Sequence, residues 1–463
     1  MLVGRLTAGK SDNATFFRGE RRSPWYIVAF GMVGASISGV SFVSVPGMVL
    51  HGDMTYLQTC MGFILGYFVV AYVLMPIYYR LNLTSIYTVL RGVNDEAYRT
   101  GAAFFIFSKL LGSAAKFFVP CLIISQTMQV PFPLTALLLF VLIWLYTRRG
   151  GIRTIVWTDS LQTLSMLIAL ILIICQVYSM LGYADMVQCI GDVMSDSHAS
   201  VFRLGDWHSS DNFFKCFLSG IFIVIVMTGL DQDMMQKNLT CRNLREAQRN
   251  MCCYGFAFLP VNMLFLVLGV MLVMLCRQTA VPLPDKPDDL MLIFAASGRL
   301  GSIVLLLFSL GIVAASFSSA DSALTALTTT MCVDICRRPN DEKLRCRMHI
   351  LMAVLFLLCT LVFHQFRGSS LIDVIYTLVS YTYGPLLGLY SFALLHKGRR
   401  ITTRWAVPII SISSPLLCLL ISNGIAMISN YHFGYELLML NGFITYIGLR
   451  LCAHSSSQAE ALV

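Results

Sequence analysis

The chain has 463 residues, of which 57% are hydrophobic and only 12% are charged, and its mean hydropathy is +0.73. A soluble protein carries about a quarter charged residues, so this composition excludes a soluble globular protein and predicts an all-α polytopic membrane protein. The net charge of +9 does not indicate a nucleic-acid partner, because the basic residues are distributed by membrane side. The 15 Cys are scattered and predict neither a disulfide framework nor a zinc site.

The apolar residues gather in twelve segments that are long enough to span a bilayer. A polar, basic N-terminal segment, residues 1–24, precedes them, and a short tail, residues 453–463, follows. The predicted spans lie at residues 25–49, 56–79, 101–127, 131–147, 154–182, 211–230, 250–276, 301–332, 347–365, 370–396, 405–428 and 434–452.

The basic residues indicate the orientation of these spans. Of the 33 Lys and Arg, 25 lie in the N-terminal segment, at the C-terminal end and in the loops after even-numbered segments up to the tenth. Five lie on the opposite side and three lie within segments. The excess of Lys and Arg on the cytoplasmic side of membrane proteins therefore predicts that both termini are cytoplasmic.

The first segment is interrupted by residues that disturb a helix. Gly39, Pro46 and Gly47 lie among serines, and Pro and Gly free backbone carbonyls that are tolerated in a membrane only inside protein or beside a cavity. Broken helices of this kind coordinate cations in secondary transporters. The alternative is an ordinary kinked helix. The serines are Ser36, Ser38, Ser41 and Ser44.

The third segment carries Lys109 and Lys116 on one helical face, with Gly112 between them. The two lysines either extend to the membrane surface or bind an anionic ligand. At the end of the sixth segment, Asp231 and Asp233 are predicted to form a solvated helix terminus on the cytoplasmic side.

The eighth segment carries a row of small and hydroxyl side chains in an apolar run, residues 311–330. Asp321 lies at the edge of this row. A carboxylate beside hydroxyls is costly in hydrocarbon, so we expect it to face a cavity, a partner or an ion, and oxygen ligands suit a hard cation. The alternative is helix packing, which also uses small residues and hydroxyls. The row consists of Ala315, Ser318, Ser319 and Ser322.

Three stretches together resemble the sodium:solute symporter family: residues 16–47, RRGGIRTIVWTDSLQT at 148–163, and residues 311–338. This resemblance implies a leucine-transporter-like core of five plus five helices in inverted repeat, residues 25–396, followed by two accessory helices in residues 397–452. Typical members have one more helix before the broken one. We therefore expect that the start of the chain is assigned too late or that this helix is missing.

The resemblance also implies sodium sites. In the first, carbonyls of Gly34, Ile37 and Ala315 and hydroxyls of Ser318 and Ser319 bind Na⁺. Some members hold a second sodium ion at the aspartate of the WTD element and hydroxyls of the eighth segment. Here that set is Asp159, Ser318, Asp321 and Ser322, and Asp321 stands where a hydroxyl is frequent.

The solute pocket departs from the family's sugar-binding pattern, because the corresponding positions are Cys60, Gly112, Val224 and Met227. In relatives that take sialic acid, an arginine meets the carboxylate near the position of Gly112. Lys109 and Lys116 lie about one turn away and are candidates to replace it. Side chains of the first segment that touch the solute in the family correspond to Ser36, Ser38 and Ser41. These departures predict a small organic anion, such as sialic acid or another carboxylate sugar.

We therefore expect a sodium-coupled symporter, not an enzyme, in a bacterial inner membrane. Its expected partners are a small solute and the lipid bilayer, without nucleic acid, and a monomer is sufficient. A membrane sensor and a proton-coupled transporter remain alternatives, and an intramembrane hydrolase or a channel is less favoured.

Overall fold

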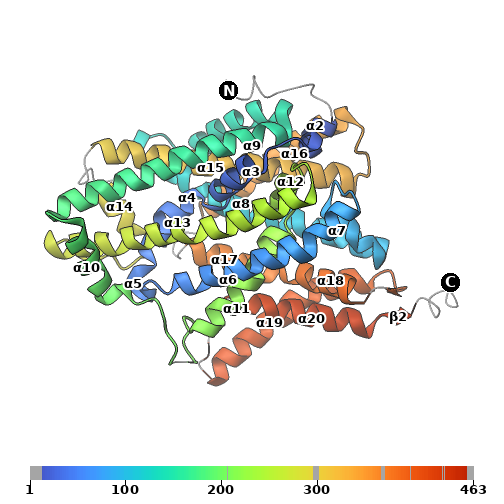
Figure 1. Cartoon of the computed structure of the whole chain (residues 1–463). Helices are drawn as coiled ribbons and strands as arrows, with labels where there is room; N and C mark the ends of the chain where they lie inside the picture. The colour runs from blue at the N-terminus through green and yellow to red at the C-terminus, as the bar shows by residue number, and fades with distance from the viewer. Residues whose placement is uncertain are drawn as a thin grey trace.

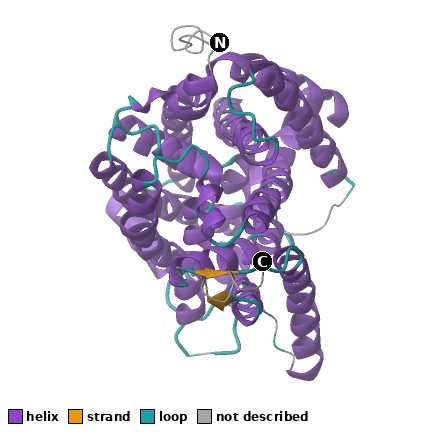
Figure 2. Cartoon of the chain, turned by 90° about the vertical axis from the view of Figure 1, so that its right-hand side faces the viewer, coloured by secondary structure: helices purple, strands orange, loops and turns teal. Residues whose placement is uncertain are grey.

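The computed structural model describes residues 13–205, 207–295, 302–365, 371–396, 398–429, 431 and 433–455. These residues are nearly all helical (Figures 1 and 2), which confirms the predicted all-α class. The two short strands, β1 (Arg399–Arg400) and β2 (His454–Ser455), pair in antiparallel fashion.

The α-helices are α2 (Asn13–Arg18), α3 (Trp25–Ser36), α4 (Gly39–Gly47), α5 (Val49–Gly52), α6 (Tyr56–Val69), α7 (Met75–Arg80), α8 (Asp95–Met128), α9 (Phe132–Leu181), α10 (Met186–Ser195), α11 (Phe213–Val224), α12 (Gln232–Asn238), α13 (Leu244–Gln278), α14 (Asp289–Ala295), α15 (Ser302–Thr330), α16 (Glu342–Phe363), α17 (Leu371–Thr382), α18 (Gly384–Leu395), α19 (Ala406–Ser429) and α20 (Leu437–Leu451). The 3₁₀ and π helices are η1 (Gly19–Arg21), η2 (Val70–Leu74), η3 (Ile86–Gly92), η4 (Ser197–Ala199), η5 (Ile225–Gly229) and η6 (Met331–Ile335).

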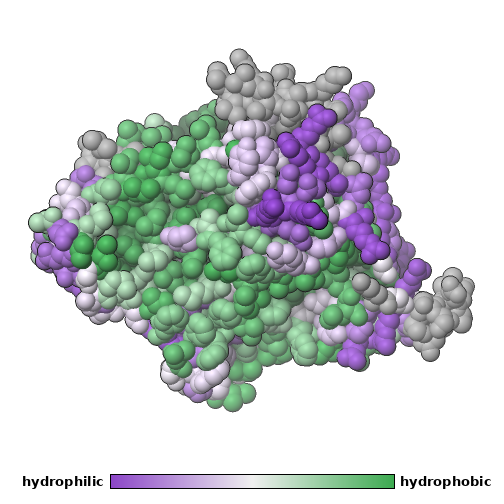
Figure 3. All heavy atoms as spheres, viewed as in Figure 1, coloured by the Kyte–Doolittle hydropathy of each residue, from purple (hydrophilic) through white to green (hydrophobic). Residues whose placement is uncertain are grey.

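The helices form a membrane-spanning bundle. Among the described residues, seven helices are long and apolar enough to cross a membrane, and the number rises to 10 if each of three bent helix pairs is one span. On the face seen in Figure 3, apolar side chains cover the middle of the molecule between more polar ends. The chain is therefore a multi-pass membrane protein. Two shorter apolar helices, Phe132–Leu145 and Leu437–Leu451, match the fourth and twelfth predicted segments, and the count of twelve stays a prediction.

The first predicted segment is a broken helix, as its Gly, Pro and Ser residues indicated. Helices α3 and α4 meet at a bend of 60°, and Ile37 and Ser38 between them are extended. The break precedes Pro46, which lies inside α4. Close packing accompanies the break: a Cβ on Gly39 would lie 2.7 Å from Ser316 Oγ of α15. The alternative of an ordinary kink is therefore wrong.

A second broken helix lies at the end of the sixth predicted segment. Helix α11 continues through η5 and then turns by 70° into α12. Asp231 sits at the turn and caps α12, because its side chain accepts hydrogen bonds from the backbone N–H groups of Asp233 and Met234. All seven residues of α12 are buried. The prediction of a solvated terminus here is wrong, because the chain re-enters the protein.

A kink in α9 separates the fourth and fifth predicted segments. Gly151 has φ 50° and ψ −146°, a conformation that glycine adopts without a steric penalty. A Cβ at this position would lie 2.5 Å from Phe16 Cα. Phe16 and Phe17 are buried, so this part of the N-terminal segment packs into the protein. Residues 1–12 and 456–463 of the predicted terminal segments lie outside the described residues.

Candidate cation and solute site

The two broken helices enclose a central cavity of about 110 Å³. The breaks lie in the first and sixth predicted segments, and α6, α8, α13, α15 and α17 complete the wall. Of the residues predicted to touch solute, Gly112 is not among those lining the cavity. The predicted solute residues that do line it are Ser36, Ser38, Ser41, Lys109 and Lys116. Val224 and Met227 also line it, whereas Cys60 does not.

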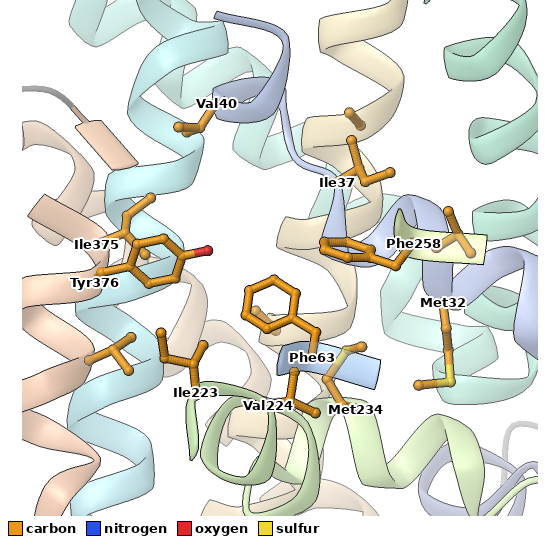
Figure 4. Close-up of a cluster of buried hydrophobic side chains, with 14 of the residues drawn as sticks. Met32, Ile37, Val40, Phe63, Ile223, Val224, Met234, Phe258, Ile375 and Tyr376 are labelled. Carbon is orange, nitrogen blue, oxygen red and sulfur yellow. The ribbon is translucent and has the colours of Figure 1, made fainter. Parts of the chain in front are cut away.

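One wall of the cavity is apolar and aromatic. Figure 4 shows Phe63 of α6 between Phe258 of α13 and Tyr376 of α17. Val224 and Met234 lie next to this group. Apolar and aromatic walls of this kind bind the apolar part of a small molecule.

Hydroxyl groups also line the cavity. Tyr67 donates a hydrogen bond of 2.8 Å to the Tyr254 hydroxyl, which is also hydrogen-bonded to Ser36 beside the first break. Ser38, Ser41 and further hydroxyls share the cavity. The cavity therefore combines one aromatic wall with a row of hydrogen-bonding groups, as solute sites do.

Lys109 forms ion pairs across the second break. Its Nζ lies 3.0 Å from Asp231 Oδ2 and 2.7 Å from Asp233 Oδ2. Tyr383 donates a further hydrogen bond of 2.8 Å to Asp231. The pairing explains why a polar half-helix is stable inside the protein, because each buried charge has a partner of opposite sign. Lys109 therefore neither extends to the membrane surface nor presents an uncompensated charge to the cavity.

Lys116 differs from Lys109 although both line the cavity from the same helix. Among the described residues, Lys116 makes no hydrogen bond or ion pair. Its ammonium is close enough to Asp231 and Asp233 to interact electrostatically, but Lys109 neutralises part of that field. Of the two lysines, Lys116 is therefore the one that lines the cavity without an ion pair to a described residue.

Charged residues of α12 also connect to α9 and, through Asp159, to α15. Lys237 is 1% exposed, and its Nζ lies 2.7 Å from Asp159 Oδ2 and 3.9 Å from Asp233 Oδ1. Asp159 Oδ1 in turn accepts a hydrogen bond of 2.6 Å from Ser318. Lys237 is one of the 25 basic residues on which the predicted orientation rests, but it is buried in α12 and does not lie in a solvated loop. A row of alternating charges, Lys109–Asp233–Lys237–Asp159, connects the cavity to the hydroxyl face of α15.

Part of the first predicted sodium set lies where α15 packs against the break of the first helix, whereas the Ser318 hydroxyl bonds to Asp159. Ser319 Oγ lies 3.2 Å from both the Ala35 and the Ala315 carbonyl oxygens. Helix α3 ends at Ser36, so the carbonyl of Gly34 in its last turn has no intrahelical donor. These neutral oxygens are ligands that suit a hard cation such as Na⁺.

The second predicted sodium set is also buried and close together. Ser322 donates a hydrogen bond of 2.6 Å to the Ser318 carbonyl, and Ser318 bonds to Asp159. Asp321 is fully buried beside them. Among the described residues, however, no group of three or more His, Cys, Asp or Glu is arranged to hold a metal ion. The ammonium of Lys237 already lies against Asp159 in this set.

A tyrosine pair separates the central cavity from a second cavity of about 640 Å³. The hydroxyls of Tyr56 and Tyr376 are hydrogen-bonded at 2.9 Å, and Tyr56 lines both cavities. Tyr376 also packs against the ring of Tyr435, which lines the larger cavity. By the predicted orientation, this larger cavity opens to the outside.

Sequence reasoning missed several of the residues that build this site. Tyr56, Tyr67, Tyr254 and Tyr376 lie in apolar runs, where a tyrosine gives no periodic signal that distinguishes a cavity from the core. The pattern from Asp231 to Lys237 did contain a signal. An Asp followed by Gln and Asp is a helix N-cap pattern, and directly after an apolar run it indicates a new helix instead of an end.

The chain is similar in sequence to known sodium-coupled transporters. The family model described as "Sodium:solute symporter family" matches residues 16–407. The human sodium/iodide cotransporter is 26% identical over 249 residues, which are 54% of this chain and 39% of that protein. The sodium/sialic acid symporter NanT of Aliivibrio fischeri is 23% identical and covers 84% of this chain and 79% of its own length. The chain spans 39% of the human cotransporter and 62% of the sodium-dependent multivitamin transporter of Oryctolagus cuniculus.

Solved structures give the same fold. A Na⁺-coupled sialic acid symporter in a substrate-bound outward-open state superposes with a TM-score of 0.83 at 18% identity, over 100% of this chain and 95% of that one. The nucleobase-cation symporter Mhp1 superposes with a TM-score of 0.63 at 13% identity, over 98% of this chain and 100% of that one. Because the family model covers most of the sequence, the chain belongs to the sodium:solute symporter family.

Proposed function

We propose that this protein is a sodium-coupled symporter that imports a small organic anion by alternating access. The observation that carries the proposal is the position of Ser319. It links the hydroxyl face of α15 to the carbonyls at the broken first helix, beside a cavity lined by Lys116. Cation sites at unwound helices next to a solute site are the arrangement that secondary transporters use. Membership of a family of transporters also supports transport and not catalysis.

The architecture supports the same proposal. The two broken helices lie in the first and sixth predicted segments, which are corresponding positions in a five-plus-five inverted repeat. We place both termini in the cytoplasm on the distribution of Lys and Arg, and the bacterial relatives support an inner-membrane location. A monomer contains all the residues that the mechanism needs.

The solute class follows from the charges that line the cavity. Lys109 is held between two carboxylates, whereas Lys116 is not paired with a described acid. A carboxylate that docks on Lys116 gains a charge-assisted bond, and the hydroxyls of Ser36, Ser38 and Ser41 bind the rest of the molecule. Relatives named for sialic acid and for monocarboxylates support an anionic solute.

Coupling requires that Na⁺ and solute favour the same conformation. A cation bound between α3 and α15 holds the first break in the geometry that presents Ser36 and Ser38 to the cavity. Solute then binds more tightly to the sodium-loaded protein, because a ligand shifts an equilibrium only by its differential affinity for the two states.

Uptake into proteoliposomes tests the proposed function. We expect accumulation of a sialic acid or a short monocarboxylate when a sodium gradient is imposed, and none when potassium replaces sodium. Accumulation that follows a proton gradient without sodium would contradict sodium coupling. Sodium-dependent binding of solute without any uptake would instead favour a sensor.

A further inference from the structure

We propose that Lys237 is a built-in cation that fills the second cation position, so that this protein binds one sodium ion at a time. The set that would hold a second Na⁺ contains Asp159, and the ammonium of Lys237 lies 2.7 Å from its Oδ2. That distance is in the range of a charge-assisted hydrogen bond. Asp159 therefore already has a permanent counter-charge.

The surroundings of Lys237 indicate that its position is built into the fold. Asp233 precedes it by four residues on α12, which puts both side chains on one face of the half-helix. Asp159 approaches from α9, and Asp321 of α15 is close enough to attract the ammonium. Lys237 is 1% exposed and Asp159 is 0% exposed, so solvent does not screen the pair. An ammonium surrounded by carboxylates from three helices occupies the electrostatic position of a bound cation.

A second sodium ion would have to share Asp159 with this ammonium. Two unit charges about 4 Å apart repel strongly enough, at the effective dielectric constant of a protein, to weaken binding by roughly a thousandfold. Ser318 and Ser322 cannot replace the lost attraction, because their hydroxyls are neutral and already bond to Asp159 and to the Ser318 carbonyl.

The first sodium set has no such competitor among the described residues. Its ligands are the carbonyls at the break of α3 and the hydroxyls of α15, and no described lysine or arginine forms an ion pair there. The first site therefore binds a sodium ion from solution, whereas the ammonium of Lys237 occupies the second. With one sodium ion per solute, import of a monoanion carries no net charge, so the membrane potential does not drive it.

The number of ions bound can be measured with sodium alone. We would record the unfolding temperature of the full chain against sodium concentration, with choline to hold ionic strength constant, and obtain the ions taken up per chain from the slope against log concentration. The wild type and Lys237→Arg, which keeps the charge, should each give a slope of one ion. Lys237→Gln removes the ammonium from the second cation position and should give a slope of two ions.

The outcomes separate this proposal from the proposed function. A slope of two ions in the wild type overturns it, and so does a slope of one in folded Lys237→Gln. If Lys237→Gln does not fold, the wild-type slope still decides. Because the proposal rests on the sodium coupling proposed above, a wild type with no sodium response at all overturns both, whereas a slope of two overturns only the role of Lys237.

Discussion

The polar groups at the two helix breaks are stabilised in different ways. At the first break, between α3 and α4, the exposed polar groups are neutral carbonyls and hydroxyls, and Ser319 reaches them from α15. At the second break, between α11 and α12, the polar groups are charged, and Lys109 and Lys237 neutralise them. The second break carries its cations in the sequence, whereas the first break offers only neutral oxygens. This difference is why we propose ion binding at the first break and structural charge pairing at the second.

The largest effect is expected from removing a lysine at the second break. Lys109→Met removes the ammonium that pairs with buried Asp231, and it leaves Asp233 with only the 3.9 Å ion pair to Lys237. Breaking a buried ion pair by removing one partner costs about 3–5 kcal/mol of folding free energy. We expect a large loss of stability in denaturation of the purified protein, whether or not sodium is present.

Lys116→Met is the matched control, because it makes the same chemical change on the same helix at the same cavity. It breaks no ion pair with a described residue and should leave stability nearly unchanged. Equal destabilisation by the two substitutions would contradict the different roles given to these lysines.

Lys116 should matter for solute instead. Lys116→Ala removes the charge that we assign to the solute carboxylate, and a hydrogen bond to a charged group contributes about 1.5–3 kcal/mol. We expect the half-saturating concentration of an anionic solute to rise about tenfold to a hundredfold. An unchanged value for this variant would remove Lys116 from the solute site.

Substitutions of the serines of α15 test whether sodium binds at the first break. Ser319→Ala removes a hydroxyl from the first sodium set, and loss of one ligand should raise the sodium concentration for half-maximal uptake about tenfold. Ser318→Ala should have the same effect on sodium and also reduce stability, because Ser318 bonds to Asp159. Ser316→Ala is the control, since Ser316 bonds to the carbonyl of Ile312 in its own helix. A Ser316 variant that resembles the Ser319 variant would contradict the assignment.

The smallest effect is expected at the tyrosine pair between the two cavities. Tyr56→Phe and Tyr376→Phe each remove the hydrogen bond that joins them, which contributes about 1 kcal/mol. Because both substitutions delete this shared bond, their losses should not add in full, and a double-mutant cycle should give a coupling energy of about 1 kcal/mol. Additive losses in thermal unfolding would show that the hydroxyls act separately.

The sequence predicted the features that depend on residues close together in the chain. The spans followed from apolar length, and the first break followed from Gly39 and Pro46 among serines. The hydroxyl face of α15 followed from helical periodicity, and the fold brings Ser319 Oγ within 3.2 Å of the Ala35 carbonyl at that break. These signals are local, so the folded structure is not needed to see them.

The second break was missed because its stability depends on partners far away in sequence. The residues of α12 are polar, and hydropathy alone places such residues in water. They can be buried because distant residues neutralise their charges. Lys109, which lies 122 residues before Asp231, pairs with that carboxylate, and Asp159 of α9 pairs with Lys237 of α12. No local pattern reports which distant charge will neutralise which. The tyrosines of the cavity were missed for the same reason, since only the packing of α6, α13 and α17 shows that they face a solute site.

The most direct test of the central claim is the thermal stability of the purified protein in sodium against potassium and choline. We predict a rise that is specific to sodium and smaller in Ser319→Ala at the same sodium concentration, with any solute adding stability only when sodium is present. Equal stability in the three salts, or a sodium-specific rise that Ser319→Ala retains in full, would contradict a sodium site at the first break.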